Sequence, residues 1–167
     1  QADISLTTSV TLAEAKKIRL DGLKLQIDAA GDVIPQGKAS LNLSGDIAAD
    51  MEKQTAGVKS LQLSVLGVNL SGNVDVTDLS GQPTASGDIA LAECNPKELM
   101  QAFGIQAPAT KDDKALTSLA LETTFEASPA HAKLPALTVK LDGNTLTGAA
   151  SAKEFDKPNV AFNLMTP

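Results

Sequence analysis

Apolar and polar residues alternate with a period of two along most of this chain. Leu61, Leu63 and Val65 share one parity with polar residues between them, and Leu137 and Val139 begin a similar run. Successive side chains of a β-strand point to opposite faces, so each run predicts a strand with one apolar and one polar face. Antiparallel sheets that are buried on one side and wet on the other typically show this pattern.

Turn residues separate these runs. Asp21-Gly22, Ser80-Gly81 and Asp142-Gly143 tolerate the positive φ values that tight hairpin turns require. Their spacing fits a β meander and leaves room for about ten strands. We therefore predict an all-β fold: a mainly antiparallel, strongly twisted and curved sheet that forms a single segment over residues 1–167.

One stretch departs from the β pattern. Asn95-Pro96 followed by Glu98 has the order of an N-cap, a first helical residue and the acid of a capping box. It predicts one short α-helix near residues 96–103, which would be marginal without tertiary packing. We expect Met100 and Phe103 to pack over one end of the sheet and seal a core.

The chain also shows a weak internal repetition, with possible repeat units near residues 57–93 and 133–166. In each unit two leucines and two glycines are spaced alike, which suggests that one supersecondary element is used twice. The residues of the first unit are followed 76 positions later by those of the second: Leu61, Gly67, Leu70 and Gly72, then Leu137, Gly143, Leu146 and Gly148.

Composition argues against several classes of partner. The net charge is −6, whereas nucleic-acid binding needs clustered Lys and Arg to neutralise phosphates. The chain has no Trp and no Tyr, the residues that sites for sugars, bases and flat cofactors usually recruit for stacking. We therefore expect no nucleic-acid partner and no cofactor.

The side chains needed for catalysis are scarce. The single His131 follows Ser128-Pro129, where we expect a solvent-exposed loop, and the single Cys94 is expected to be a buried structural residue. Nucleophilic catalysis needs a base beside the nucleophile, and one His with one Cys does not make a zinc site. We expect no catalytic residues, no metal site and no enzymatic activity.

The main feature left for a function is the apolar surface of the predicted strands. Moving an acyl chain of roughly 16 carbons into water costs about 12 kcal/mol, at about 0.8 kcal/mol per methylene, so a continuous apolar sheet face suits a lipid ligand. A β sandwich whose two inner faces cover each other satisfies the same alternation. Periodicity alone favours the sandwich.

Three stretches of the chain follow the elements of one known protein family in order and spacing. The segment IALAECNPKELMQAFGI (Ile89–Ile105) is similar to a strand, Asn-Pro start and short helix of that family. PATKDDKALTSLALE (Pro108–Glu122) looks like its acidic linker and the strand that follows. In Leu134–Leu164 the stretch LTVKLDGNTLTGAASA resembles the hairpin Leu-Asp-x-x-x-Leu-x-Gly, which is followed by a Pro-containing turn and a Phe-x-Leu strand. Together these stretches resemble the AsmA family of Gram-negative envelope proteins. The resemblance covers about Leu41 to Pro167, and the chain stops short of the acidic segment into which the family usually continues.

This resemblance implies a gutter of β-strands that holds acyl chains on its concave face. It implies a longer parent protein, anchored in the inner membrane and largely periplasmic, and relatives regarded as lipid bridges between the two membranes. The implied function is non-enzymatic phospholipid transport and outer-membrane homeostasis, with other envelope proteins as possible partners. The alternative is a structural or scaffolding β module in outer-membrane protein assembly.

We predict that bound lipid lies along one apolar face. Its members share the apolar parity of their strands, and Gly72 and Gly148 at strand centres would ease bending of the sheet. The candidate lipid-binding residues are Leu41, Leu43, Ile47, Leu61, Leu63, Val65, Val74, Val76, Ile89, Leu91, Leu119, Leu121, Leu137, Val139, Phe162 and Leu164.

Overall fold

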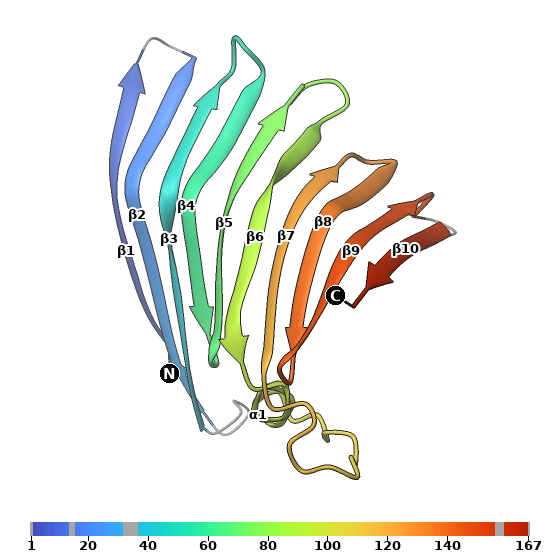
Figure 1. The fold of residues 1–167 in the computed structure, drawn as a ribbon. Helices are drawn as coiled ribbons and strands as arrows, with labels where there is room; N and C mark the ends of the chain where they lie inside the picture. The colour runs from blue at the N-terminus through green and yellow to red at the C-terminus, as the bar shows by residue number, and fades with distance from the viewer. Residues whose placement is uncertain (1, 14–15, 32–36, 156–158, 167) are drawn as a thin grey trace.

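A computed structural model describes residues 2–13, 16–31, 37–155 and 159–166, which form one antiparallel ten-stranded sheet and one short helix. The strands lie side by side in chain order, so that each pairs with the next (Figure 1). This confirms the predicted all-β fold. The strands are β1 (Ala2–Ala13), β2 (Lys17–Ala30), β3 (Lys38–Asp50), β4 (Thr55–Val65), β5 (Val68–Thr77), β6 (Thr84–Cys94), β7 (Leu119–Ala127), β8 (His131–Leu141), β9 (Asn144–Lys153) and β10 (Asn159–Met165).

The sheet is a single open layer. Its edges, β1 and β10, do not pair with each other, and no second sheet covers either face among the described residues. In the described part of the chain the only buried apolar side chains are Ala102, at 5% exposure, and Pro96, and both belong to the short helix. The β sandwich favoured by periodicity is therefore wrong, because alternation specifies the faces of a strand and not what covers them.

The strand register joins the apolar residues of neighbouring strands. Directly opposed residues of an antiparallel pair place their side chains on the same face. One row of register partners runs unbroken across nine strands, from β1 to β9. Its members are Leu6, Leu25, Leu43, Leu63, Leu70, Leu91, Leu121, Val139 and Leu146.

A line of irregularities crosses the sheet roughly midway along the strands, and we call it the crease. In β2, β4 and β8 the register shifts by an extra residue, between Leu20 and Leu23, Val58 and Leu61, and Leu134 and Leu137. In β3, β5 and β9 a glycine lies at the same level of the sheet. Gly45 pairs with Leu23 of β2, Gly72 with Leu61 of β4, and Gly148 with Leu137 of β8.

Bulges and glycines are the usual means of bending a strand. A Cβ atom at Gly72 would overlap the backbone carbonyl oxygen of Asp88 in β6, and one at Gly148 would overlap that of Asn163 in β10. Close approach of the neighbouring strand therefore requires glycine there. The strands bow in a common direction (Figure 1). Because the bends are aligned, the sheet forms an open trough whose long axis follows the crease, across the strands.

Helix α1 (Pro96–Ala102) lies at one end of the sheet, between β6 and β7 (Figure 1). As predicted, the Asn95 side chain caps it by accepting hydrogen bonds from the backbone N–H groups of Lys97 and Glu98. Phe103 follows the helix and is 53% exposed, so the expectation that it seals a core is wrong. The reason is that a single-layer sheet has no core to seal. No described helix has the length and apolar character needed to cross a membrane.

The two possible repeat units form equivalent hairpins. In β4–β5 the turn residues Leu66 and Gly67 have φ values of 49° and 82°, and in β8–β9 Asp142 and Gly143 have 49° and 80°. Positive φ at both central residues is the signature of a type I′ turn. Each hairpin also carries a bulge in its first strand and a crease glycine in its second. The matching spacing therefore reflects matching local geometry.

Candidate functional site

All the predicted lipid-binding residues lie on one side of the sheet, which we call the trough face. Within each strand they have the parity of the nine-residue row, and the register carries that parity from strand to strand. The bulge in β4 matters here, because it places Val58 on the same side as Leu61 although the two residues differ in parity. The structure thus brings the predicted set together.

The sequence-based prediction missed part of this face. The missing residues come mainly from the first two strands, and their alternation was visible in the sequence. The turn predicted at Asp21-Gly22 is wrong: both residues lie inside β2, at a bulge that allows the strand to continue while its alternation changes phase. The omitted apolar residues include Ile4, Leu6, Val10, Leu12, Ile18, Leu20, Leu23, Leu25, Ile27, Val58, Val68, Leu70, Phe125, Leu134, Leu141, Leu146 and Val160.

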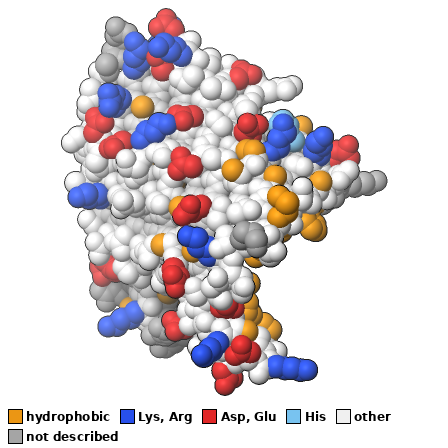
Figure 2. All heavy atoms as spheres, viewed as in Figure 1, with side chains coloured by type: hydrophobic (Ala, Val, Ile, Leu, Met, Phe, Trp, Pro, Cys, Tyr) orange, Lys and Arg blue, Asp and Glu red, His pale blue; other side chains and the backbone are white. Residues whose placement is uncertain are grey.

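Among the described residues of the ten strands, the register places no charged side chain on the trough face. The polar residues on that side are Thr8, between Leu6 and Val10, Thr123, and Asn144 at the start of β9. The charged residues of the strands lie on the opposite, polar face. Figure 2 shows acidic and basic side chains spread over the sheet, with hydrophobic side chains gathered toward β8–β10. An uncharged face is a condition for holding an apolar ligand.

Exposure differs between the middle and the edges of the trough face. Leu43, Leu63 and Leu91 in the central strands are half-buried, although no layer covers them. In the edge strands Leu12 and Phe162 are each 73% exposed. Side chains on the inner side of a bend converge and shield one another. The burial of the crease glycines in β3 and β5 agrees with this position on the inner side.

The polar face has shallow hollows of a different character. One of about 530 Å³ is lined mainly by Ser, Thr, Asn and Gln side chains, among them Asn42 and Gln62. Another of about 600 Å³ is bordered by Arg19, Lys59 and Asp75. Sites for apolar ligands are lined predominantly by hydrophobic side chains. The first hollow departs from this rule, whereas the lining of the second also includes Ile18, Ile47 and Val76 beside its charged residues.

The potential catalytic residues are half-buried. His131 is the first residue of β8 and not part of an exposed loop, which corrects the prediction. Its Nδ1 atom lies 2.9 Å from Ser128 Oγ, and that oxygen also accepts hydrogen bonds from the backbone N–H groups of Ala130 and His131. The serine hydroxyl therefore closes a turn. Cys94 has a free thiol and is half-buried. We expected full burial, but among the described residues no second layer covers this part of the sheet.

Carboxylates with perturbed acidity lie away from the trough face. Hydrogen bonds from Ser40 and Gln26 lower the pKa of Asp28, and the backbone N–H of Lys53 lowers the pKa of Asp50. The pKa of Asp142, in the β8–β9 turn, is lowered by backbone N–H groups of the segment before β7. Within the described ranges no group of three or more His, Cys, Asp or Glu side chains is placed to hold a metal.

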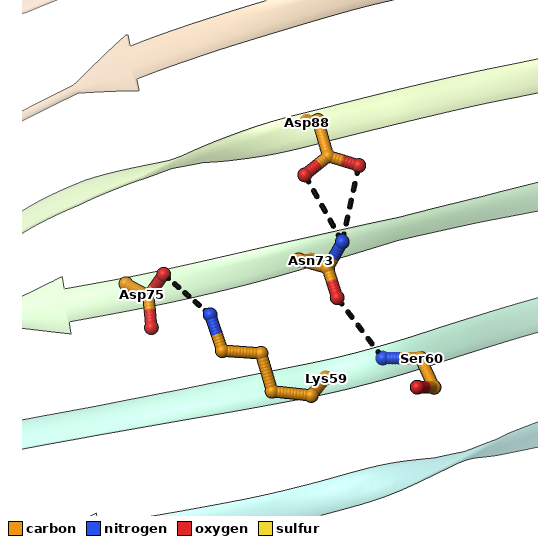
Figure 3. A network of polar contacts seen from close by, with 5 residues as sticks. All are labelled: Lys59, Ser60, Asn73, Asp75 and Asp88. Carbon is orange, nitrogen blue, oxygen red and sulfur yellow. Dashed lines mark hydrogen bonds and ion pairs between the residues drawn. The ribbon is translucent and has the colours of Figure 1, made fainter.

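A polar network spans the outer side of the crease (Figure 3). Asn73 in β5 accepts a hydrogen bond from the backbone N–H of Ser60, at the β4 bulge, over 3.0 Å. Its amide nitrogen donates to both carboxylate oxygens of Asp88 in β6, at 3.0 and 3.3 Å. Lys59 Nζ lies 2.7 Å from Asp75 Oδ2. This ion pair is more than half exposed and stabilises little, whereas the Asn73 bonds join three strands.

Comparison with family models, with curated proteins and with solved structures found no match to this chain. The resemblance to the AsmA family therefore stays a prediction.

Proposed function

We propose that this chain is a non-enzymatic segment that holds the acyl chains of phospholipid along its trough face. The observation that carries the proposal is an apolar, uncharged face that extends through all ten strands and is covered by no other layer among the described residues. Soluble monomers rarely leave so large a contiguous apolar surface exposed, and such surfaces mark binding sites. A ligand that needs only apolar contact fits a face that offers little else.

The dimensions of the trough suit a long ligand. Ten strands at about 4.8 Å spacing give an apolar floor roughly 43 Å long, which accepts a complete acyl chain lengthwise. Each buried methylene contributes about 0.8 kcal/mol, so a chain of roughly 16 carbons in full contact supplies binding energy without a polar anchor. The apolar floor reaches both outer strands, β1 and β10, so a lipid can lie along the crease across the whole sheet.

The cellular role that we propose rests on the resemblance to AsmA-type proteins. In that role the chain belongs to a longer, inner-membrane-anchored protein whose periplasmic part carries phospholipid toward the outer membrane. The single-layer trough supports this role, since a passage for lipid needs a continuous apolar floor and an open side for the polar headgroup.

Lipid retention tests the proposal directly. The chain is expressed, purified without detergent and analysed by native mass spectrometry and by lipid extraction. We expect co-purified phospholipid, and displacement of an apolar fluorescent probe by added phospholipid. A chain that carries no lipid and binds no apolar probe would remove the basis for the proposal.

Charge substitutions identify the face. Val65→Asp, Val76→Asp and Val139→Asp each place a charge on the trough face, where desolvation beside an acyl chain is costly. Matched controls place the same charge on the opposite face of the same strands: Ser64→Asp, Thr77→Asp and Thr138→Asp. We expect at least one folded trough variant to lose lipid while the controls retain it. Full retention in every folded trough variant would show that lipid binds elsewhere.

The edge strands favour one alternative, a scaffolding module that pairs with other strands. Val160 and Phe162 in β10 are 60% and 73% exposed. β10 contains neither a charged residue nor proline, which usually prevent an edge strand from pairing with another chain. Ala161→Lys would place a charge on the polar face of β10, opposite Ser151, which disfavours strand addition at this edge and leaves the trough face uncharged. Under the scaffolding alternative this variant loses its assembly with a partner. The lipid-binding proposal makes no demand on assembly and requires that the variant keep its lipid content.

A further inference from the structure

The apolar pattern of β4 changes phase within the strand. Leu61, Leu63 and Val65 occupy odd positions, whereas Ala56 and Val58 occupy even ones. A strand with strict alternation cannot show both sets on one face. The register shift between Val58 and Leu61 resolves the conflict by inserting one residue into the ladder. The trough face is therefore continuous in β4 only as long as this bulge persists.

The neighbour of this bulge is a charged residue. Lys59 lies on the polar face and pairs in register with Asp46. If the strand slipped by one residue and removed the bulge, Lys59 would move to the trough face and Val58 would leave it. An unpaired ammonium group beside an acyl chain is strongly unfavourable. A one-residue slip thus converts part of the apolar floor into a charged one.

Asn73 holds the bulge in place from the adjacent strand. Ser60 has a φ of 53°, an unfavourable conformation for a residue other than glycine, and its N–H donates to Asn73 Oδ1 over 3.0 Å. The other end of the amide is fixed by Asp88, at 3.0 and 3.3 Å (Figure 3). The side chain thereby satisfies a backbone donor that the irregular ladder leaves unpaired.

The other bulges have polar contacts of their own. In β2 the N–H of Gly22, with φ of 63°, donates to Asp46 Oδ1 over 2.7 Å. In β8 the carbonyl of Ala136 accepts a hydrogen bond from Thr123 Oγ1 over 2.9 Å. The same arrangement, a side chain of a neighbouring strand bonded to the backbone of a bulge, therefore recurs along the crease.

We propose that Asn73 is a positioning residue of the lipid-binding face. It holds the β4 bulge in place, which fixes the register of β4 so that Lys59 stays on the polar face. This inference rests on the proposed function for its lipid readout, but the positioning itself is a property of the fold. Asn73 lies on the polar face, away from the acyl chain, and acts through the backbone at Ser60.

The test uses Asn73→Ala, which removes the hydrogen bonds to Ser60 and Asp88, with Asn69→Ala as the control on the same strand and face but away from the bulge. We expect faster hydrogen exchange at the Ser60 amide and a several-fold weaker affinity for an apolar fluorescent probe in Asn73→Ala alone, with the far-ultraviolet circular dichroism unchanged. Unchanged exchange at Ser60 would overturn this role of Asn73, whether or not the chain binds lipid.

A rescue experiment separates slippage from a general loss of stability. Lys59→Met alone should leave probe binding unchanged, because Lys59 lies on the polar face. Combined with Asn73→Ala it should restore probe affinity, since the residue that slips into the trough is then uncharged. Failure of Lys59→Met to restore affinity would refute the slip. If the unmodified chain binds no probe, the proposed function fails, and exchange at Ser60 still decides whether Asn73 holds the bulge.

Discussion

Asp142 Oδ1 accepts a hydrogen bond from the backbone N–H of Thr117 over 2.8 Å, which joins the β8–β9 turn to the segment before β7. The same carboxylate also accepts from the backbone N–H groups of Leu116 and Ser118, at 2.5 and 3.1 Å. Leu116 has a φ of 58°, so the carboxylate holds a strained segment at the end of the trough near α1. Three backbone donors on one carboxylate stabilise its charged form and lower its pKa.

This arrangement predicts an acid-dependent opening of the 116–118 segment. A carboxylate whose pKa is lowered by folding stabilises the fold fully above its ordinary value of 3.8, and this contribution is lost as the pH falls through the lowered value. We expect hydrogen exchange at Thr117 and Ser118, corrected for the intrinsic pH dependence, to rise only in that acidic range. Asp142→Asn removes the titration, so a pH response that persists in this variant would contradict the assignment.

The crease glycines should resist substitution. A Cβ at Gly72 or Gly148 would overlap a carbonyl oxygen of the next strand, so the strands must separate or twist to admit it. We expect Gly72→Ala and Gly148→Ala to lower the free energy of unfolding by about 1–3 kcal/mol each, the usual cost of overpacking. Gly31→Ala is the control, since a Cβ added there would meet nothing within 4 Å and its φ lies outside the left-handed region. Equal stability of all three variants in urea would show that the close approach is not required.

Helix α1 should depend on its cap. Asn95 Oδ1 accepts from the backbone N–H groups of Lys97 and Glu98 at 3.0 and 3.3 Å. Asn95→Ala removes this cap, which typically costs about 1 kcal/mol. We expect faster hydrogen exchange within Pro96–Ala102 and no change in the central strands. Exchange that rises throughout the sheet would show that the helix supports the whole fold.

The two potential catalytic residues should be dispensable for lipid binding. His131→Ala removes the contact with Ser128 Oγ, and Cys94→Ser removes the free thiol at the end of β6. Both lie outside any arrangement that we assign to chemistry. We expect lipid content and probe affinity to match those of the unmodified chain. Loss of either property in a variant with an unchanged circular dichroism spectrum would reveal a site that the geometry does not show.

The sequence was sufficient for the local elements. Alternation predicted the strands and which side of each strand is apolar, because side-chain direction in a strand is a local property. The order Asn95-Pro96 with Glu98 located the helix for the same reason, since capping involves residues within one turn. Phase changes such as that between Val58 and Leu61 were present in the sequence, but their meaning depends on the neighbouring strand that supplies Asn73.

Only the tertiary structure decided that the apolar face stays open. The residues of Leu137–Leu141 would alternate in the same way in a sandwich and in a trough, because alternation constrains a strand relative to its own sheet and not to a second layer. Whether a second layer forms depends on the paths of all ten strands, and here each strand pairs with its neighbour in chain order. Bending at aligned bulges and glycines then turns the apolar rows inward without covering them, and our proposal of an apolar ligand rests on this shape.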